Sequence, residues 1–122
     1  MLNLCAISGR LTRDPSVKQT QNGVSVATFT VAVDRDFKSG GEKEADFINC
    51  VAWRSAAEFI GKYFEKGSAI TVTGRIQTRT FTDKEGEKHT TTEVVVDRTY
   101  FGEKKKDTFV EDDEDDGELP FD

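Results

Sequence analysis

Five segments of the chain show the alternation of hydrophobic and polar residues that is typical of β-strands. They are residues 4–11, 24–37, 46–54, 69–82 and 90–101. Successive side chains of a strand point to opposite faces, so one face of each segment is expected to form a core. Gly9 predicts a bulge or a close approach of another backbone in the first segment. Asn22 and Gly23 predict a hairpin turn before the second, because both residues tolerate positive φ.

The second segment changes its hydrophobic parity. Val24 and Val26 are followed by Phe29, Val31 and Val33, which lie on the opposite parity. This change predicts a bulged and strongly bent strand.

The third segment is asymmetric. Its small aliphatic side, with Ile48, Cys50 and Ala52, is predicted to be core. The opposite side is larger and partly polar, and it carries Phe47, Asn49, Val51 and Trp53.

A short helix is predicted after the third segment. Ser55 and Glu58 have the spacing of a capping box, and Gly67 is a plausible C-cap. The hydrophobic residues between them recur at helical spacing and are interpreted as core: Phe59, Ile60, Tyr63 and Phe64.

This order of elements predicts an all-β fold, a five-stranded OB-fold barrel with one helix between its third and fourth strands. The barrel is expected to occupy residues 1–105, followed by a disordered acidic tail over residues 106–122. Charge supports the division, since residues 1–106 hold all 17 basic residues against 14 acidic ones, whereas residues 107–122 hold nine acids and no base. The overall charge of -6 therefore conceals a mildly basic domain.

Composition excludes several classes of protein. No apolar run approaches the ~20 residues needed to cross a bilayer, and residues 1–4 do not resemble a secretion signal, so a cytoplasmic protein without a membrane partner is expected. Cys5 and Cys50 lack the spacing of a zinc site and are interpreted as reduced core residues. Neither a metal nor another cofactor is predicted.

The fourth segment presents an unusual outer face. Its inner side carries Ile70, Val72 and Ile76. Its outer side carries Arg75, Gln77, Arg79 and Phe81. Two guanidiniums beside an aromatic ring suit a ligand that is both anionic and flat, and a nucleic acid strand is both.

Four aromatic residues are predicted to stack nucleic acid bases: Phe37, Phe47, Trp53 and Phe81. Eight basic residues are predicted to contact phosphates: Arg10, Arg13, Arg35, Lys38, Arg54, Arg75, Arg79 and Lys84. Aromatic platforms that alternate with cations allow single strands to bind without sequence preference. A solvated or core role remains the alternative for each residue taken singly.

Two other functions remain open. An enzyme lacks support, because the sequence nominates no nucleophile with a base, no phosphate loop and no metal-ligand spacing. The single histidine, His89, is interpreted as an exposed residue beside a loop. An RNA-binding barrel of the cold-shock or initiation-factor type would also use aromatic and basic residues on a curved sheet.

Several blocks of sequence, taken in order, resemble the bacterial or phage-encoded single-stranded DNA-binding protein family. They are Gly-Arg-Leu-Thr-Arg-Asp-Pro (9–15), Asn-Gly (22–23), Phe-Ile-Asn-Cys-Val-Ala-Trp (47–53), Ala-Glu-Phe (57–59), Lys-Gly (66–67), Gly-Arg-Ile-Gln-Thr-Arg-Thr-Phe (74–81) and Thr-Thr-Glu-Val-Val-Val (91–96). The resemblance spans roughly residues 1–102. It implies a nucleoid-associated homotetramer that binds single-stranded DNA in replication, recombination and repair, with the family's stacking positions on the four aromatics above.

The tail resembles the family's acidic C-terminal peptide, which docks on replication, recombination and repair proteins. Its candidate partner-binding residues are Asp115, Asp116, Glu118, Leu119, Pro120, Phe121 and Asp122. Two features depart from the family pattern. Asp122 follows the Phe on which that peptide usually ends, and the link over residues 104–110 is short.

Overall fold

The computed structural model describes residues 1–36 and 44–102. Its elements are β1 (Cys5–Leu11), β2 (Ser16–Gln19), β3 (Ser25–Asp34), β4 (Ala45–Trp53), α1 (Ser55–Tyr63), β5 (Ala69–Thr82) and β6 (Lys88–Phe101). The five predicted strands and the helix are confirmed, and β2 is an additional short strand. Phe37, Lys38 and the tail fall outside the described residues.

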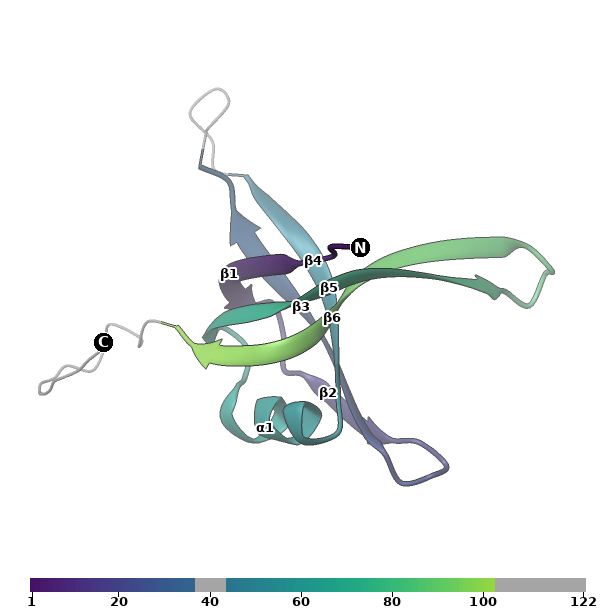
Figure 1. Cartoon of the computed structure of the whole chain (residues 1–122), viewed down its shortest axis with the longest axis horizontal. Coiled ribbons are helices and arrows are strands. Elements are labelled where there is room, and N and C mark those ends of the chain that lie inside the picture. Colours follow the sequence, from purple (N-terminus) through teal and green to yellow (C-terminus); the bar gives the residue numbers. More distant parts are fainter. Residues whose placement is uncertain (37–43, 103–122) are drawn as a thin grey trace, which may run out of the picture.

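The strands close into the predicted OB-fold barrel (Figure 1). Their order is β1-β5-β6-β4-β3-β2, and an additional pairing of β1 with β3 closes the sheet. All neighbours are antiparallel except β4 and β6, which are parallel. The helix α1 lies across one end of the barrel (Figure 1). None of the helices in the described ranges is long and apolar enough to span a membrane.

The core fills the barrel and the space beneath α1. Its fully buried members include Val31, Ile60, Ile70 and Val72. The predicted core side of β4 is confirmed, because Cys50 is buried among them and desolvation raises the pKa of its thiol to about 12. Both cysteines are free thiols.

Gly9 lies where two backbones meet, as predicted. A Cβ at this position would overlap the carbonyl oxygen of Ala32 and lie 2.8 Å from Cγ1 of Val31. Only a residue without a side chain lets β1 approach β3 closely enough for Leu11 to pair with Val31 and close the barrel.

The hairpin predicted at Asn22 and Gly23 is confirmed, and it joins β2 to β3. The Gly23 amide donates to the carbonyl of Thr20 at 2.9 Å. Of the two turn residues only Gly23 has a positive φ, of 80°. The turn therefore depends on one left-handed residue rather than two.

The parity change predicted for β3 is wrong. Its buried residues, Ser25, Ala27, Phe29 and Val31, lie on one continuous parity, and its register with β4 is unbroken from Val26 to Asp34. The core positions at the start of the strand hold the small residues Ser25 and Ala27. Val24 and Val26 lie outside the buried parity, so their hydrophobicity falsely indicates the core side. The register shift occurs instead between β5 and β6 at Thr73/Gly74.

The capping box predicted for the helix is also wrong. The N-cap is Arg54, and none of the described side chains caps the helix with a hydrogen bond. The Glu58 amide donates to the Arg54 carbonyl at 3.1 Å, while the Glu58 carboxylate accepts a hydrogen bond from the Ser25 hydroxyl at 3.1 Å. Glu58 thus ties α1 to β3, a long-range contact that competes with the local cap.

The helix aromatics are only partly core. Phe64 is buried, but Tyr63 is 51% exposed, so its predicted core role is wrong. Phe59, Tyr63 and Phe64 form a ring cluster with Phe101 at the end of β6. The helix ends at Tyr63, and Gly67, with φ 86°, belongs to the following turn rather than to the cap itself.

The β5–β6 hairpin extends beyond the barrel (Figure 1). We call residues 76–93 the arm. Pairing continues to Thr82 and Lys88 at its end. Ile76, predicted to be core, is 47% exposed, because β5 leaves the barrel at this position. The Asn3 side chain donates to the Ile76 carbonyl at 2.8 Å and accepts from the Ile76 amide at 2.9 Å.

Candidate nucleic-acid interface

Strand register gathers the outward side chains of four strands on one continuous surface. Pairing runs without interruption across β3, β4, β6 and β5: Thr28 pairs with Val51, Val51 with Val95, and Val95 with Arg75. Paired residues point to the same face of a sheet. We call this surface the β4 face; its other members are Thr30, Phe47, Asn49, Trp53, Gln77, Arg79, Phe81, Thr91 and Glu93.

Three of the four predicted stacking residues lie exposed on the β4 face. Phe47 is 67% exposed, Phe81 46% and Trp53 44%. Phe47 and Trp53 begin and end the exposed side of β4, about 20 Å apart at the usual rise of a strand, and Phe81 lies near the end of the arm. The structure therefore offers separated platforms rather than one aromatic cluster. Phe37 lies outside the described residues.

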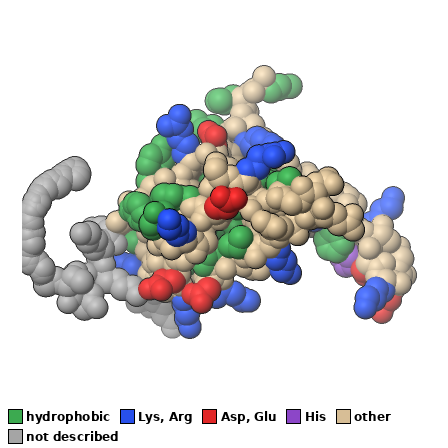
Figure 2. Space-filling model, turned by 90° about the horizontal axis from the view of Figure 1, so that it is seen from below, with side chains coloured by type: hydrophobic (Ala, Val, Ile, Leu, Met, Phe, Trp, Pro, Cys, Tyr) green, Lys and Arg blue, Asp and Glu red, His purple; other side chains and the backbone are tan. Residues whose placement is uncertain are grey.

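The ring of Phe81 is supported from one side by His89. The two rings stack with centroids 5.4 Å apart and 27° between their planes. The imidazole Nε2 lies 2.7 Å from Oδ2 of Asp83. Asp83 Oδ1 accepts from the amides of Glu85 and Glu87, each at 2.9 Å. His89 is exposed, as predicted, but it is part of an ordered tip, and charged side chains of both signs gather there (Figure 2).

Hydrogen bonds at this tip lower the pKa of Asp83. The bond to His89 is the largest cause, and the bond from the Glu87 amide follows. Asp83, Glu87 and His89 are also the one group of potential metal ligands in the described part of the chain, with ligand atoms within 4.8 Å of one another. Both oxygens of Asp83 are already engaged in the hydrogen bonds above, so a metal ion would have to displace them.

A groove runs along the β4 face between the barrel and the arm. Its lining includes Arg13, Ser16, Thr30, Asn49, Arg79 and Glu93. Two of the predicted phosphate contacts, Arg13 and Arg79, thus meet in one groove. The Thr30 hydroxyl and Asn49 Oδ1 lie 3.2 Å apart on its floor, where they offer polar groups to a ligand.

Arg75 and Arg79 are linked through their neighbours on the β4 face. Arg79 Nε lies 3.1 Å from Glu93 Oε2, and Gln77 Nε2 lies 3.4 Å from the same oxygen. Arg75 Nη1 donates to Gln77 Oε1 at 3.2 Å. Both arginines are exposed to solvent rather than part of the core.

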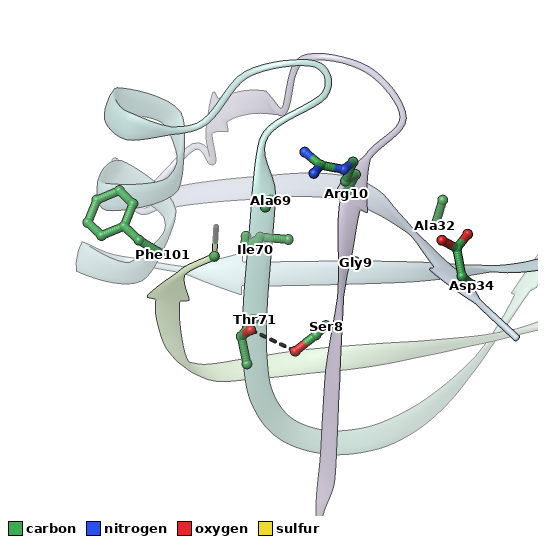
Figure 3. A pocket seen from close by; sticks show the side chains of 10 residues that line it. Ser8, Gly9, Arg10, Ala32, Asp34, Ala69, Ile70, Thr71 and Phe101 are labelled. Carbon is green, nitrogen blue, oxygen red and sulfur yellow. Dashed lines mark hydrogen bonds between the residues drawn. The ribbon is translucent and has the colours of Figure 1, made fainter. Parts of the chain in front are cut away.

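Arg10 lies over a second hollow, between β1 and the flanking strands β3 and β5 (Figure 3). Its Nη1 donates to the carbonyl of Gly67 at 3.0 Å. Register aligns Arg10 with Ala32 and Ala32 with Phe47, so Arg10 shares an outer surface with Phe47, which lies two strands away. It does not line the groove that holds Arg13 and Arg79.

Arg35 is held by two carboxylates. Nη1 lies 2.7 Å from Glu44 Oε1, and Nη2 lies 2.8 Å from Asp46 Oδ1. The hydrogen bond between Arg35 and Asp46 is the largest cause of a raised pKa for Arg35 and of a lowered pKa for Asp46. A phosphate would have to compete with these acids for the guanidinium.

The remaining described candidates are exposed. Arg54 directly follows Trp53, and Lys84 lies in the turn of the arm. Lys38 lies outside the described residues. Sequence reasoning missed Lys18, which register aligns with Val26 and so with Trp53, because β2 was not predicted. It also missed the role of Glu93, since alternation marks the face of a residue but not its cross-strand neighbours.

A closed OB-fold barrel with exposed rings and guanidiniums on one face defines an oligonucleotide-binding class of protein. Residues 2–102 match the model of the Single-strand binding protein family. The chain belongs to this family.

The printed names of similar curated proteins agree with this family assignment. The Single-stranded DNA-binding protein of Halalkalibacterium halodurans is 51% identical over 106 residues, which are 86% of this chain and 63% of that protein. The protein of the same name from Oceanobacillus iheyensis is 52% identical, with coverage of 86% and 66%. Single-stranded DNA-binding protein 1 of Staphylococcus aureus (strain MSSA476) is 51% identical over a match that covers 86% of this chain and 68% of that protein. The chain thus spans slightly less than two thirds of the first two relatives.

Proposed function

We propose that the protein binds single-stranded DNA without sequence preference and protects it during replication, recombination and repair. The observation that carries the proposal is the β4 face, where strand pairing places three exposed rings on the same face as Arg75 and Arg79. The family and the printed names of the relatives support it.

Binding follows from two kinds of contact. Bases stack on Phe47, Trp53 and Phe81, each worth about 1–3 kcal/mol, and because every base has a π-face the contact tolerates any sequence. Phosphates meet the guanidiniums beside them, including Arg13 and Arg79 in the groove. A duplex hides its π-faces, so single strands are preferred. No catalytic step is part of this function.

We further propose that the protein acts as a homotetramer. Exposed apolar residues and an open strand edge support self-association: Leu2 is 91% exposed and Leu4 71%. Within the described ranges, Arg10 and Leu11 are the only residues of β1 that pair with β3, so the preceding residues of the strand are paired there on one side only. An unpaired apolar edge is a ready partner for a second copy.

The remaining parts of the proposal rest on the sequence. Residues 1–105 form the DNA-binding and oligomerisation domain, and residues 106–122 form the tail that recruits replication, recombination and repair proteins. The protein acts in the cytoplasm, at the nucleoid.

Fluorescence anisotropy with labelled oligo-dT, oligo-U and a DNA duplex of equal length tests the proposal. Oligo-dT is expected to bind most tightly and to remain intact. Phe81→Ala should weaken its binding by about 5- to 150-fold, the equivalent of one stacked base. Tyr63→Ala removes an equally exposed ring from α1 and should leave binding unchanged. Equal or tighter binding of oligo-U would favour the RNA-binding alternative, and cleavage of the strand would favour an enzyme.

A further inference from the structure

A carboxylate lies among the arginines of the β4 face. Glu93 is on β6, in register with Gln77 of β5, lines the groove beside Arg79 and is 9% exposed. By charge alone it should repel phosphates and weaken the binding of any nucleic acid. Its contacts indicate a different effect.

One oxygen of Glu93 connects Arg79 of the arm with Arg75, which directly precedes the arm. Oε2 accepts from Arg79 Nε at 3.1 Å and from Gln77 Nε2 at 3.4 Å. Gln77 in turn accepts from Arg75 Nη1 at 3.2 Å. The chain of contacts therefore runs from Arg75 through Gln77 and Glu93 to Arg79.

The atom that Arg79 uses decides what remains available to a ligand. A guanidinium has five N–H donors, and Glu93 engages the single one on Nε. The two Nη groups make no hydrogen bond or ion pair in the described part of the chain, and the side chain is 58% exposed. The contact at Nε thus holds the guanidinium and leaves its two Nη groups, which can bind a phosphate in a bidentate manner, without a polar partner among the described residues.

We propose that Glu93 is a positioning residue for DNA binding: its carboxylate orients Arg79 directly, and Arg75 through Gln77, to receive the phosphates of a single strand. The inference rests on the proposed function. A role in stability alone is a poor explanation, because an ion pair whose arginine is largely exposed contributes little to folding.

Glu93→Gln keeps the shape of the side chain and removes its charge. If Glu93 only repels DNA, this variant should bind oligo-dT more tightly. If it positions the arginines, binding should weaken by about 2- to 13-fold for each arginine released, the cost of ordering such a side chain on binding. The salt dependence should also fall, by about 0.7 in log–log slope for each phosphate that the released arginines no longer bind.

Glu87→Gln is the matched control, since Glu87 lies in the turn of the arm, where its amide, not its side chain, bonds Asp83. It removes the same charge and should bind oligo-dT as tightly as the wild type or slightly more tightly. Combining Glu93→Gln with Arg79→Ala tests the direct link: the weakening caused by Glu93→Gln should shrink in the Arg79→Ala background.

The outcomes separate the two proposals. Wild-type protein that fails to bind oligo-dT removes the proposed function. Wild-type protein that binds, with Glu93→Gln binding equally or more tightly, overturns the role of Glu93 and leaves the function standing. If Glu93→Gln does not fold, Gln77→Ala breaks the link to Arg75 on an outward-facing position; weaker binding supports the inference, and unchanged binding overturns it.

Discussion

Arg54 has a backbone conformation that an L-residue rarely adopts. Its φ of 59° and ψ of -127° make it the one described non-glycine residue with positive φ. The conformation is imposed from both sides, because the Arg54 amide donates to the Ser25 carbonyl at 2.8 Å and its carbonyl accepts from Glu58. The turn from β4 into α1 is therefore strained.

Replacing Arg54 with glycine should stabilise the fold. Such a conformation costs about 1–3 kcal/mol for a residue with a Cβ. Glycine avoids that cost but loses about 0.5–1 kcal/mol through the greater freedom of the unfolded chain. The expected net gain in free energy of unfolding is about 0.5–2 kcal/mol, and each kcal/mol corresponds to a Tm increase of about 4–8 °C in a domain of this size.

Thermal unfolding of Arg54→Gly and Arg54→Ala, at one fixed protein concentration, isolates the backbone effect. Both variants lack the same exposed side chain, but alanine keeps the Cβ and so keeps the strain. Arg54→Gly should melt above both Arg54→Ala and the wild type. A glycine variant no more stable than the alanine variant would refute the reasoning. Both variants should bind oligo-dT less tightly if Arg54 contacts a phosphate.

Three further changes have defined outcomes. Gly9→Ala should destabilise the protein by about 1–3 kcal/mol or more in urea unfolding, because its Cβ overlaps the Ala32 carbonyl. Thr99→Val should stabilise it by about 1 kcal/mol, because the Thr99 hydroxyl is buried without a hydrogen-bond partner among residues 1–36 and 44–102; equal stability would indicate an unseen partner. His89→Ala should raise the pKa of Asp83 toward its ordinary value, as measured by NMR. In the wild type, the contribution of Asp83 to stability is present above its unfolded pKa and lost as pH falls through the lower folded value. In the variant this contribution should be smaller and its loss complete at a higher pH, because the folded pKa then lies closer to the unfolded one.

The parts of the fold that depend on alternation could be predicted from the sequence. The core side of β4 and the close approach at Gly9 follow from residue type and spacing. The arm could not be delimited in this way, because its strands alternate in the same manner as the barrel strands beside them. Ile76 was therefore assigned to a core that ends just before it.

Predictions failed where a distant residue overrode a local pattern. The spacing of Ser55 and Glu58 suits a cap, but Ser25, thirty-three residues from Glu58, takes the carboxylate instead. Likewise, the choice of Phe81 as a platform required only strand parity, whereas its support by His89 depends on pairing across the hairpin. Strand parity thus shows which side chains share the β4 face, but not the cross-strand contacts that order them.

The fluorescence of Trp53, the only tryptophan in the chain, tests the central claim most directly. It should be titrated with oligo-dT at two salt concentrations, with oligo-U and a duplex for comparison. We predict strong quenching by oligo-dT, weakened by salt with a slope near -0.7 for each phosphate contacted. Emission that stays unchanged while oligo-dT is bound would show that the strand does not cross the β4 face at Trp53, and it would contradict the account.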